Sequence, residues 1–302
     1  MEILVLGKNG QLGWELQQTQ NTQHNVIYLG SQELDITDEE KLNRLLPQWQ
    51  PSLIINATAY TAVDKAESDQ QAAYAVNSKG VEYLAKYCQS NQIKLIHIST
   101  DFVFNGEQNT PYKPTDPTSP VSVYGASKRD GERQVRKWLG SQASIVRTAW
   151  VYSQHGNNFV KTMLRLMSEK DQLGVVYDQV GTPTWAKGLA EMVWKLAEKM
   201  ANNSNEKTNE EITPEAQTPI YHWTDAGVTS WYDFAVAIQD IAFNKGLLDK
   251  KIPIRPIPAS AYPTPAKRPN YSVLDKSAIE QDLQIETQHW REQLTKLMEQ
   301  LA

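Results

Sequence analysis

Short apolar runs alternate with amphipathic stretches along the first half of the chain. The runs are rich in Val, Ile and Leu, and they cover residues 3–6, 26–29, 53–57, 93–99 and 144–149. The stretches between them have the apolar spacing of helices, and they cover residues 12–20, 38–47, 69–91 and 124–139. Unbroken apolar runs are typical of strands buried on both faces of a parallel sheet, which right-handed βαβ units build. The pattern therefore predicts an α/β fold with a doubly wound parallel sheet.

The rhythm changes after Trp150. Strand-like and helical patterns continue at residues 159–170, 173–177, 187–200, 220–223 and 230–244. Residues 201–218 are polar with almost no large apolar side chains, which predicts a surface loop. Residues 252–269 contain six prolines, which favour extended backbone that wraps a surface or lines a cleft. The second half is therefore expected to be less regular than the first.

Composition and charge exclude several classes of protein. Apolar residues make up 40% and charged residues 22% of the 302 positions, which argues against intrinsic disorder. The formal charge is −5, so we expect no broad basic surface for nucleic acid or anionic lipid. A single cysteine, Cys88, excludes an intramolecular disulfide and a multi-cysteine metal site. The chain shows no signal-peptide pattern and no apolar run of membrane-spanning length, so we expect a soluble cytoplasmic protein.

A glycine-rich turn follows the first predicted strand and leads directly into a predicted helix. Gly7, Gly10 and Gly13 have the spacing Gly-x-x-Gly-x-x-Gly, which resembles that of the short-chain dehydrogenase/reductase superfamily. Glycines at such a turn let the backbone approach a pyrophosphate, and the helix N-terminus offers it free N–H groups. We therefore predict that this turn, together with Gln11 and Leu12, binds a dinucleotide.

This motif also suggests how the chain divides into domains. Residues 1–149 are expected to form a Rossmann-like dinucleotide-binding domain, to which the chain returns at about 178–200 and 219–245. Residues 150–177 and 246–302 are expected to form a smaller C-terminal substrate-binding domain.

The end of the second predicted strand bears on the choice between NADH and NADPH. It reads Leu29-Gly30-Ser31-Gln32, without the carboxylate that would bond the adenosine ribose and repel a 2′-phosphate. With Lys8 nearby, the sequence leans towards NADPH and leaves NADH open. We expect Asp35 and Ile36 beside the adenine.

Two further signals are typical of proton-transfer chemistry. Tyr124 and Lys128 are four residues apart, which places them on one face of a predicted helix. We expect the lysine charge to lower the pKa of the phenol, so that Tyr124 can exchange a proton with a carbonyl oxygen. Thr100 and Asp101 follow a predicted strand, where ligands bind in open parallel sheets. The Thr100 hydroxyl is expected to hydrogen-bond the same oxygen, although both residues could merely cap the next turn.

Several segments together resemble the dTDP-4-dehydrorhamnose reductases, which belong to the extended short-chain dehydrogenase/reductase superfamily. The resemblance runs from residue 1 to about 275. It is carried by residues 7–16 (GKNGQLGWEL), 56–67 (NATAYTAVDKAE), 99–104 (STDFVF), 123–128 (VYGASK), 147–152 (RTAWVY), 156–166 (GNNFVKTMLRL), 178–184 (DQVGTPT) and 261–269 (AYPTPAKRP). Gly30 departs from the aspartate that some members carry, Phe102 departs from a common tyrosine, and the loop at 201–218 is longer than usual.

The resemblance implies an activity and a role for each matching residue. Members reduce the C4 keto group of dTDP-4-dehydro-L-rhamnose with NAD(P)H, which makes dTDP-L-rhamnose for cell-surface polysaccharide. Tyr124 would donate the proton, Lys128 would hold the nicotinamide ribose, and Thr100 would bond the C4 oxygen. Asp101 and Phe102 would contact the sugar. The dinucleotide would also be lined by residues after the third strand, namely Ala57, Ala59, Tyr60 and Thr61.

The remaining predicted contacts lie in the second half. Trp150 would stack on the sugar or the thymine. Bonding to the pyrophosphate is expected from Asn157, Asn158, Lys267 and Arg268, because a net-negative protein needs local positive charge for a dianion. Ordinary surface solvation is the alternative for the two basic residues.

Metal binding and assembly are weakly specified. The five histidines show no ligand spacing, so no metal site is predicted. Some relatives place magnesium at a dimer contact near Glu15, but the spacing here does not support magnesium, and we expect Glu15 to be a solvated surface carboxylate. The sequence leaves open whether the protein is a monomer or a homodimer.

Two other functions remain open at this point. The first is a dinucleotide-binding regulatory subunit like the β subunit of methionine adenosyltransferase. The second is a different nucleotide-sugar reductase or epimerase on the same scaffold. Intact Thr100, Tyr124 and Lys128 favour the reductase.

Overall fold

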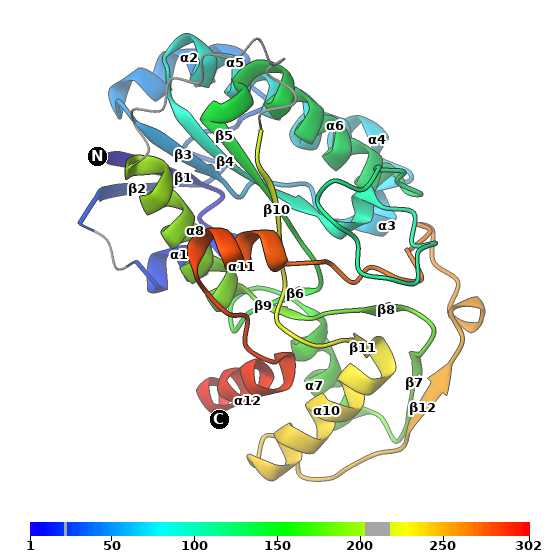
Figure 1. Cartoon of the computed structure of the whole chain (residues 1–302). Coiled ribbons are helices and arrows are strands. Elements are labelled where there is room, and N and C mark those ends of the chain that lie inside the picture. The colour runs from blue at the N-terminus through cyan, green and yellow to red at the C-terminus, as the bar shows by residue number, and fades with distance from the viewer. Residues whose placement is uncertain (21–22, 203–217) are drawn as a thin grey trace.

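A six-stranded parallel sheet organises the first part of the molecule (Figure 1). The computed structural model describes residues 1–20, 23–202 and 218–302, so most of the predicted loop at 201–218 lies outside the described residues. The order of the strands is β10-β5-β4-β3-β1-β2. Their bounds are β1 (Glu2–Leu6), β2 (Asn25–Leu29), β3 (Leu53–Asn56), β4 (Lys94–Thr100), β5 (Ala143–Thr148) and β10 (Ile220–Trp223). The predicted α/β fold with a doubly wound sheet is thus confirmed.

Helices cover both faces of this sheet because its strands are apolar on both sides. Leu4 and Leu6 of β1 pack with one cluster, and the alternating Ile3 and Val5 pack with the other. The first face is covered by α2 (Glu39–Leu45), α5 (Val81–Ser90) and α6 (Val123–Leu139). The opposite face is covered by α1 (Gln11–Gln18), α8 (Ala186–Asn202) and α11 (Ser277–Leu283).

The prediction of one continuous helix over residues 69–91 is wrong, because the structure divides this segment into separate helical pieces. The chain forms α3 (Val63–Ala66), α4 (Gln70–Tyr74) and then a π-helical turn η2 (Ala75–Gly80) before α5. Asn77 lies in this turn with a fully buried side chain. Its amide accepts a hydrogen bond from Tyr60 N–H at 2.9 Å and donates to Ser127 Oγ at 3.0 Å. The turn therefore joins the segment after β3 to α6, a constraint that apolar spacing cannot reveal.

A second hydrophobic core lies below the sheet in Figure 1. It is built from α7 (Phe159–Glu169), α10 (Trp231–Asn244), α12 (Trp290–Leu301) and the parallel pair β7 (Leu173–Val176) and β12 (Ile254–Ile257). Two short strand pairs lie between the cores, namely β6 (Val151–Tyr152) with β9 (Thr184–Trp185) and β8 (Val180–Gly181) with β11 (Thr229–Ser230). Single 3-10 turns occur at η1 (Leu46–Gln48), η3 (Asp101–Val103), η4 (Gly140–Gln142) and η5 (Ala259–Ala261).

The packing differs from the expected domain division at two places. Helix α10 was assigned with residues 219–245 to the first domain, but Phe234 and Ile238 pack in the second core with the methionines of α7. Helix α11 was assigned with residues 246–302 to the second domain, but Ile279 packs beneath the sheet with α8. Apolar spacing marks both helices as amphipathic and does not say which core each one meets.

The segment at residues 264–275, which we call the strap, crosses between the two cores. Val180 N–H donates to the Asn270 carbonyl at 2.7 Å, and Ser272 N–H donates back to the Val180 carbonyl at 2.8 Å. Farther along, Tyr112 N–H donates to the Val273 carbonyl at 2.8 Å. The strap is thus tied to both parts of the molecule. Within the described residues, no helix combines the length and apolarity that crossing a membrane requires.

A buried ion pair joins α6 to the sheet. Arg147 of β5 donates from Nε to Glu132 Oε1 at 2.8 Å and from Nη2 to Glu132 Oε2 at 2.7 Å. Ser99 Oγ donates to the same carboxylate at 2.6 Å. Both charged side chains are almost completely buried, at 3% and 4% exposure. Each charge therefore depends on the other for compensation.

We expect Glu132→Ala to lower the free energy of unfolding by about 3–5 kcal/mol, because it leaves the Arg147 charge buried without a partner. Urea unfolding measures the loss. The matched control is Glu169→Ala, which breaks an exposed pair with Arg165 on α7 and should cost under about 1 kcal/mol. Equal losses in the two variants would contradict this account of the buried pair.

Candidate active site

Three of the predicted catalytic residues meet at the carboxyl end of β4. Thr100 ends this strand, and Tyr124 and Lys128 lie in the first turns of α6. Ser122 begins α6 by accepting a hydrogen bond from Gly125 N–H at 3.2 Å. Lys128 Nζ donates to the Ile98 carbonyl at 2.7 Å, which holds the helix against the end of the strand. All three side chains are buried.

Burial controls the charges of Tyr124 and Lys128. It raises the pKa of Tyr124 to about 12, although a hydrogen bond with Thr100 acts in the opposite direction. It lowers the pKa of Lys128 to about 8, against the attraction of Glu132. The prediction that the ammonium lowers the phenol's pKa is therefore wrong for this structure, because desolvation of the phenolate dominates. Tyr124 is protonated at neutral pH, which suits a proton donor.

Asp101 lies beside this group and is also buried. Thr100 Oγ1 donates to Asp101 Oδ1 at 3.0 Å and accepts from Phe102 N–H at 3.2 Å, so Thr100 also caps the following turn. Burial raises the pKa of Asp101 to about 6, while hydrogen bonds from Ser272 and Thr100 lower it. The Phe102 ring meets the Tyr124 ring edge-on, with centroids 5.5 Å apart. Phe102 is therefore a wall beside the phenol.

The glycine turn lies at the carboxyl end of β1 and is packed against the exit of β3. Gly7 has φ +91°, and a Cβ at Gly7 would lie 2.8 Å from the Ala57 carbonyl. A Cβ at Gly13 would lie 2.1 Å from the Gly7 carbonyl oxygen. Gly10 begins α1 and has no side chain with which to cap the first N–H groups of the helix. These features fit a pyrophosphate at the helix N-terminus.

The remaining predicted cofactor contacts lie around this edge. Leu12 is buried in the core beneath the turn, and Gln11 is half-buried. Ala59 and Thr61 are exposed, and Ala57 and Tyr60 are half-buried. Ile36 packs in the sheet's core, and the Asp35 carboxylate accepts from the backbone N–H and hydroxyl of Thr37 at 2.9 and 2.8 Å.

The sequence missed a carboxylate at the end of β2. Glu33 accepts from Gly30 N–H at 2.9 Å, and its other oxygen pairs with Lys8 at 2.5 Å. The expectation of no carboxylate at this strand end is therefore wrong, because a turn brings Glu33 back to Gly30. The available signal was an acidic residue three positions after the glycine that follows the strand.

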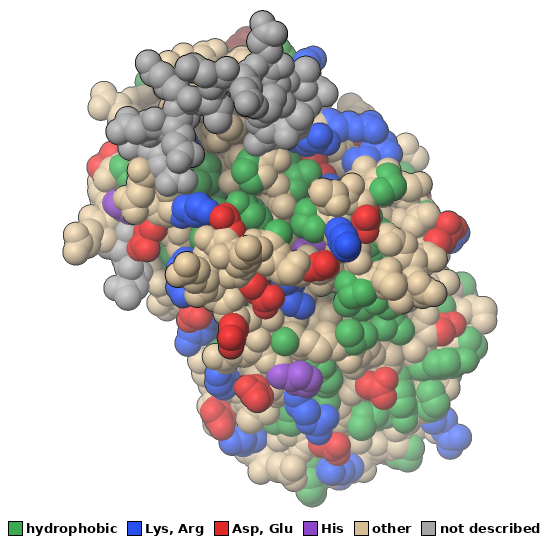
Figure 2. All heavy atoms as spheres, viewed as in Figure 1, with side chains coloured by type: hydrophobic (Ala, Val, Ile, Leu, Met, Phe, Trp, Pro, Cys, Tyr) green, Lys and Arg blue, Asp and Glu red, His purple; other side chains and the backbone are tan. Residues whose placement is uncertain are grey.

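On the substrate side, Trp150 is held in a strained backbone conformation with φ +48°. Its ring stacks on Trp231, with centroids 3.5 Å apart and planes 8° apart. Trp231 borders a cavity of about 480 Å³. The cavity is mostly apolar and is lined by residues from α7, β7 and the proline-dense segment, including Phe159, Met163, Leu166, Val176, Tyr262 and Arg268. Figure 2 shows hydrophobic side chains gathered over the region of β7 and β12.

No sequence signal pointed to Trp231, because it carries no motif of its own. It follows Ser230, which begins α10 by accepting a hydrogen bond from Asp233 N–H at 3.0 Å. Only the fold brings its ring onto Trp150.

The two asparagines predicted to bond the pyrophosphate differ in their exposure and in their hydrogen bonds. Asn157 is exposed. Asn158 begins α7 by accepting from Lys161 N–H at 3.1 Å, and it donates to Gln11 Oε1 at 3.0 Å and to the Ser153 carbonyl at 2.6 Å. The Asn158 amide therefore connects α7 with the helix that follows the glycine turn.

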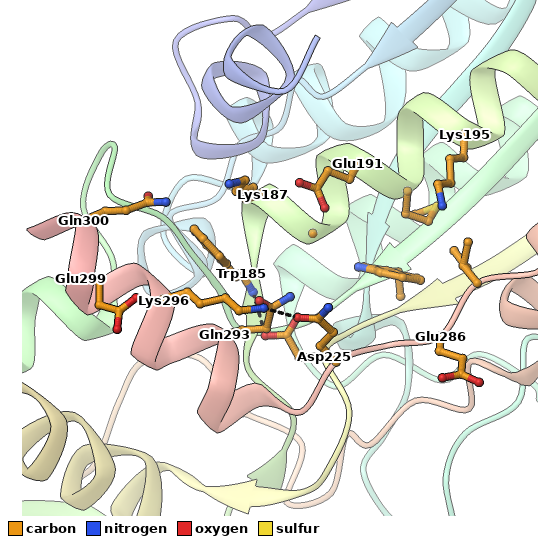
Figure 3. A pocket seen from close by; sticks show the side chains of 15 residues that line it. Trp185, Lys187, Glu191, Lys195, Asp225, Glu286, Gln293, Lys296, Glu299 and Gln300 are labelled. Carbon is orange, nitrogen blue, oxygen red and sulfur yellow. Dashed lines mark hydrogen bonds between the residues drawn. The ribbon is translucent and has the colours of Figure 1, made fainter. Parts of the chain in front are cut away.

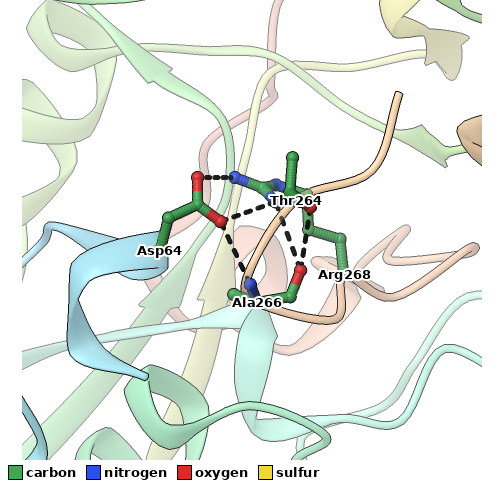
Figure 4. Close-up of polar contacts among 4 residues, drawn as sticks. All are labelled: Asp64, Thr264, Ala266 and Arg268. Carbon is green, nitrogen blue, oxygen red and sulfur yellow. Dashed lines mark hydrogen bonds and ion pairs between the residues drawn. The ribbon is translucent and has the colours of Figure 1, made fainter. Parts of the chain in front are cut away.

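The two basic residues predicted to bond the pyrophosphate also differ in their exposure and in their partners. Lys267 is exposed to solvent. Arg268 donates from Nη1 and Nη2 to the two carboxylate oxygens of Asp64, at 3.0 and 2.7 Å (Figure 4). The expected free cation at Arg268 is thus paired with a carboxylate on α3.

Glu15 is not the solvated carboxylate that the sequence suggested. It is 2% exposed and accepts a hydrogen bond from Ser153 Oγ at 2.7 Å, because α1 packs against the connection between β6 and α7. Burial raises its pKa. In the part of the chain that the structure describes, no three His, Cys, Asp or Glu side chains are grouped as a metal site.

A separate cavity of about 540 Å³ lies between α8 and α12 (Figure 3). Lys187 and Glu191 approach it from α8, and Lys296 approaches it from α12. At its base, Asp225 accepts from Trp185 N–H at 3.1 Å, and burial raises the pKa of Asp225 to about 8. None of the predicted site residues lines it.

Comparison with known proteins gives a consistent result. The family model described as "RmlD substrate binding domain" matches residues 1–302. The chain is 40% identical to the dTDP-4-dehydrorhamnose reductase of Aggregatibacter actinomycetemcomitans, over 98% of this chain and 97% of that protein. The crystal structure of a dTDP-4-dehydrorhamnose reductase from Clostridium acetobutylicum aligns with a TM-score of 0.88 at 38% identity, covering 100% of this chain and 99% of that chain. The enzyme of the same name from Bacillus anthracis, solved in complex with NADP, aligns with a TM-score of 0.88 at 32% identity, covering 99% of each chain.

We expect Asp101→Asn to change how stability depends on pH. The pKa of Asp101 is raised from 3.8 to about 6, so the folded state holds this proton more tightly and loses stability as pH rises through that range. Asparagine keeps the uncharged shape. The variant should match the wild type near pH 4 and exceed it by up to about 3 kcal/mol at pH 7.5, as urea unfolding measures. A difference that does not vary with pH would contradict the raised pKa.

Proposed function

The chain belongs to the dTDP-4-dehydrorhamnose reductase family, and from this premise we propose that it reduces the C4 keto group of dTDP-4-dehydro-L-rhamnose. The product is dTDP-L-rhamnose, a precursor of cell-surface polysaccharide, and the reductant is NADPH or NADH. The observation that carries the proposal is the meeting of Thr100, Tyr124 and Lys128 at the carboxyl end of β4. In open parallel sheets this edge is where ligands bind.

The cofactor fits at the same edge of the sheet. Strands β1, β3 and β4 are adjacent and parallel, so their carboxyl ends lie together. The glycine turn after β1 and Ala57 after β3 would hold the dinucleotide, whose bound nicotinamide supplies the hydride. Together with Ala57, the residues Ala59, Tyr60 and Thr61 would form one wall of the cofactor site. Asp35 and Ile36 would lie towards the adenine.

The chain's own residues supply position and a proton. Tyr124, which its pKa of about 12 keeps protonated at neutral pH, donates its proton to the ketone oxygen as hydride adds to C4 and that oxygen becomes an alkoxide. Thr100 orients that oxygen, and Lys128 holds the cofactor ribose beside Tyr124. Asp101 and Phe102 contact the sugar from the adjoining turn. A buried site of this kind strengthens each polar contact because water is excluded.

The nucleotide end of the substrate would extend towards the second core. The cavity of about 480 Å³ beside the Trp150–Trp231 stack is mostly apolar, which suits the planar thymine. Asn157, Asn158, Lys267 and Arg268 remain the proposed contacts to the diphosphate. Asn158 and Arg268 would reach it only by adding to, or exchanging, the hydrogen bonds they make now.

We place the reaction in the cytoplasm, where nucleotide sugars serve as small-molecule substrates. The sequence leaves both a monomer and a homodimer open, and sedimentation velocity distinguishes the two. A turnover assay tests the function itself. Absorbance of NADPH or NADH should fall only when dTDP-4-dehydrorhamnose is added, and no loss with either cofactor would contradict the proposal.

We expect Tyr124→Phe to lower turnover by about 10²–10⁴, the usual contribution of a positioned proton donor. Cofactor affinity, followed by fluorescence titration, should change little because the ring remains. Tyr87→Phe on α5 removes a phenol outside the site and serves as the control. Near-normal turnover in Tyr124→Phe would remove Tyr124 from the reaction.

The Lys8–Glu33 pair predicts a change in cofactor preference. Glu33→Gln removes a carboxylate at the end of β2 and frees Lys8 for a 2′-phosphate. The ratio of kcat/KM for NADPH to that for NADH should rise about two- to fivefold, as expected for a solvent-exposed charge. Lys8→Ala should shift the ratio the other way. An unchanged ratio in both variants would exclude this pair from cofactor choice.

A further inference from the structure

Asp64 belongs to a segment, VDKAE at residues 63–67, to which the proposed function gives no role. It lies on α3, which begins two residues after the 57–61 wall proposed for the cofactor. Its carboxylate accepts three hydrogen bonds from residues about two hundred positions away, two from Arg268 and one from Ala266 N–H at 3.2 Å. Figure 4 shows these contacts converging on the one carboxylate. Asp64 thus joins the cofactor side of the molecule to the strap.

Arg268 is fixed by more than the ion pair. Its Nη1 also donates to Thr264 Oγ1 at 2.5 Å and to the Ala266 carbonyl at 3.3 Å. The planar guanidinium therefore closes the turn 264–268 on itself and presents both terminal nitrogens to Asp64. The pairing lowers the pKa of Asp64, so the carboxylate is charged at neutral pH.

The turn held by Asp64 is one wall of the apolar cavity. Tyr262, Thr264 and Arg268 line it opposite residues of α7 and β7. The backbone bonds that tie the strap to Val180 and Tyr112 begin only at Asn270. Before that point, the contacts of residues 264–268 with the first core include those to Asp64. Removing the carboxylate should therefore loosen this wall and leave the later part of the strap in place.

We propose that Asp64 is a positioning residue for the sugar nucleotide: it holds Arg268 and the turn 264–268 as a ready-made wall of the substrate cavity. The inference rests on the proposed function. Because this wall is already ordered, substrate binding does not have to lose the conformational entropy of ordering it. Loss of Asp64 should therefore weaken substrate affinity. The side chains of Arg268 and Asp64 are 25% and 41% exposed, so this ion pair contributes little to the free energy of unfolding. We therefore expect its loss to change the turn 264–268 and not the fold as a whole.

The test compares Asp64→Asn with a control that breaks a similar ion pair. We expect KM for dTDP-4-dehydrorhamnose to rise about five- to tenfold, with kcat within about twofold and unchanged cofactor affinity. The control is Asp240→Asn, which breaks the ion pair between Asp240 of α10 and Lys251. The Asp240 side chain is 38% exposed and the Lys251 side chain is 45% exposed. It should leave KM unchanged.

Arg268→Lys tests the fork itself, because lysine keeps the charge and cannot bond both carboxylate oxygens in one plane. We expect it to raise KM to a similar extent. The double variant should be no worse than Arg268→Lys alone, because Asp64 acts on the substrate through Arg268 and its turn. Additive losses, or a KM that falls in Asp64→Asn because Arg268 is released to the substrate's diphosphate, would overturn the proposal.

Hydrogen exchange gives a readout that needs no substrate. The Ala266 amide, which donates to Asp64, should exchange faster in Asp64→Asn than in the wild type, while β4 keeps its protection. Unchanged exchange at residues 264–268 would overturn the positioning role. A wild-type protein that fails to turn over the keto sugar would instead overturn the proposed function, and the exchange comparison would still decide what Asp64 holds.

Discussion

The seating of α6 on the end of β4 is the constraint on which the site depends. Lys128 Nζ donates to the Ile98 carbonyl, and Glu132 accepts from Ser99 Oγ and from Nε and Nη2 of Arg147. The four side chains of Lys128, Glu132, Ser99 and Arg147 are buried. The helix is fixed at two successive turns, and Tyr124 at its start is held beside Thr100. Buried charges of this kind need a partner, and the contacts that pair them also fix the position of Tyr124 in the first turn of the helix.

Desolvation, rather than ion pairing, sets the protonation of the site. It raises the pKa of Tyr124 and of Asp101 and lowers that of Lys128. The consequence is a phenol that is neutral at physiological pH and a lysine that holds its proton less tightly than a lysine in water. Proton donation to an alkoxide needs a protonated donor, so the environment suits reduction of a ketone. The second core and the strap line an apolar cavity, and Trp231 at its edge stacks on Trp150.

The sequence predicted the parallel sheet, most of its helices and the candidate residues Thr100, Tyr124 and Lys128, because each of these depends on local patterns. Buried strands read as apolar runs, the glycine turn follows the first strand, and Tyr124 and Lys128 are one helical turn apart. What it missed depends on contacts between distant segments. Glu33 returns to Gly30 through a turn, Glu15 is buried by the β6–α7 connection, and Trp231 reaches Trp150 only in the folded chain. Arg268 was predicted as a pyrophosphate contact, which stays a prediction, and its partner Asp64, about two hundred residues away, carries no spacing signal.

The account as a whole is tested most directly by following the hydride. The protein should be incubated with dTDP-4-dehydrorhamnose and NADPH or NADH that carries deuterium at C4 of the nicotinamide, and the product examined by NMR. We expect a single deuterium at C4 of the sugar in dTDP-L-rhamnose, because in the proposed reaction Thr100 and Tyr124 hold the C4 oxygen beside the nicotinamide. Label at another carbon, or cofactor that stays reduced, would contradict the assignment of this site to ketone reduction.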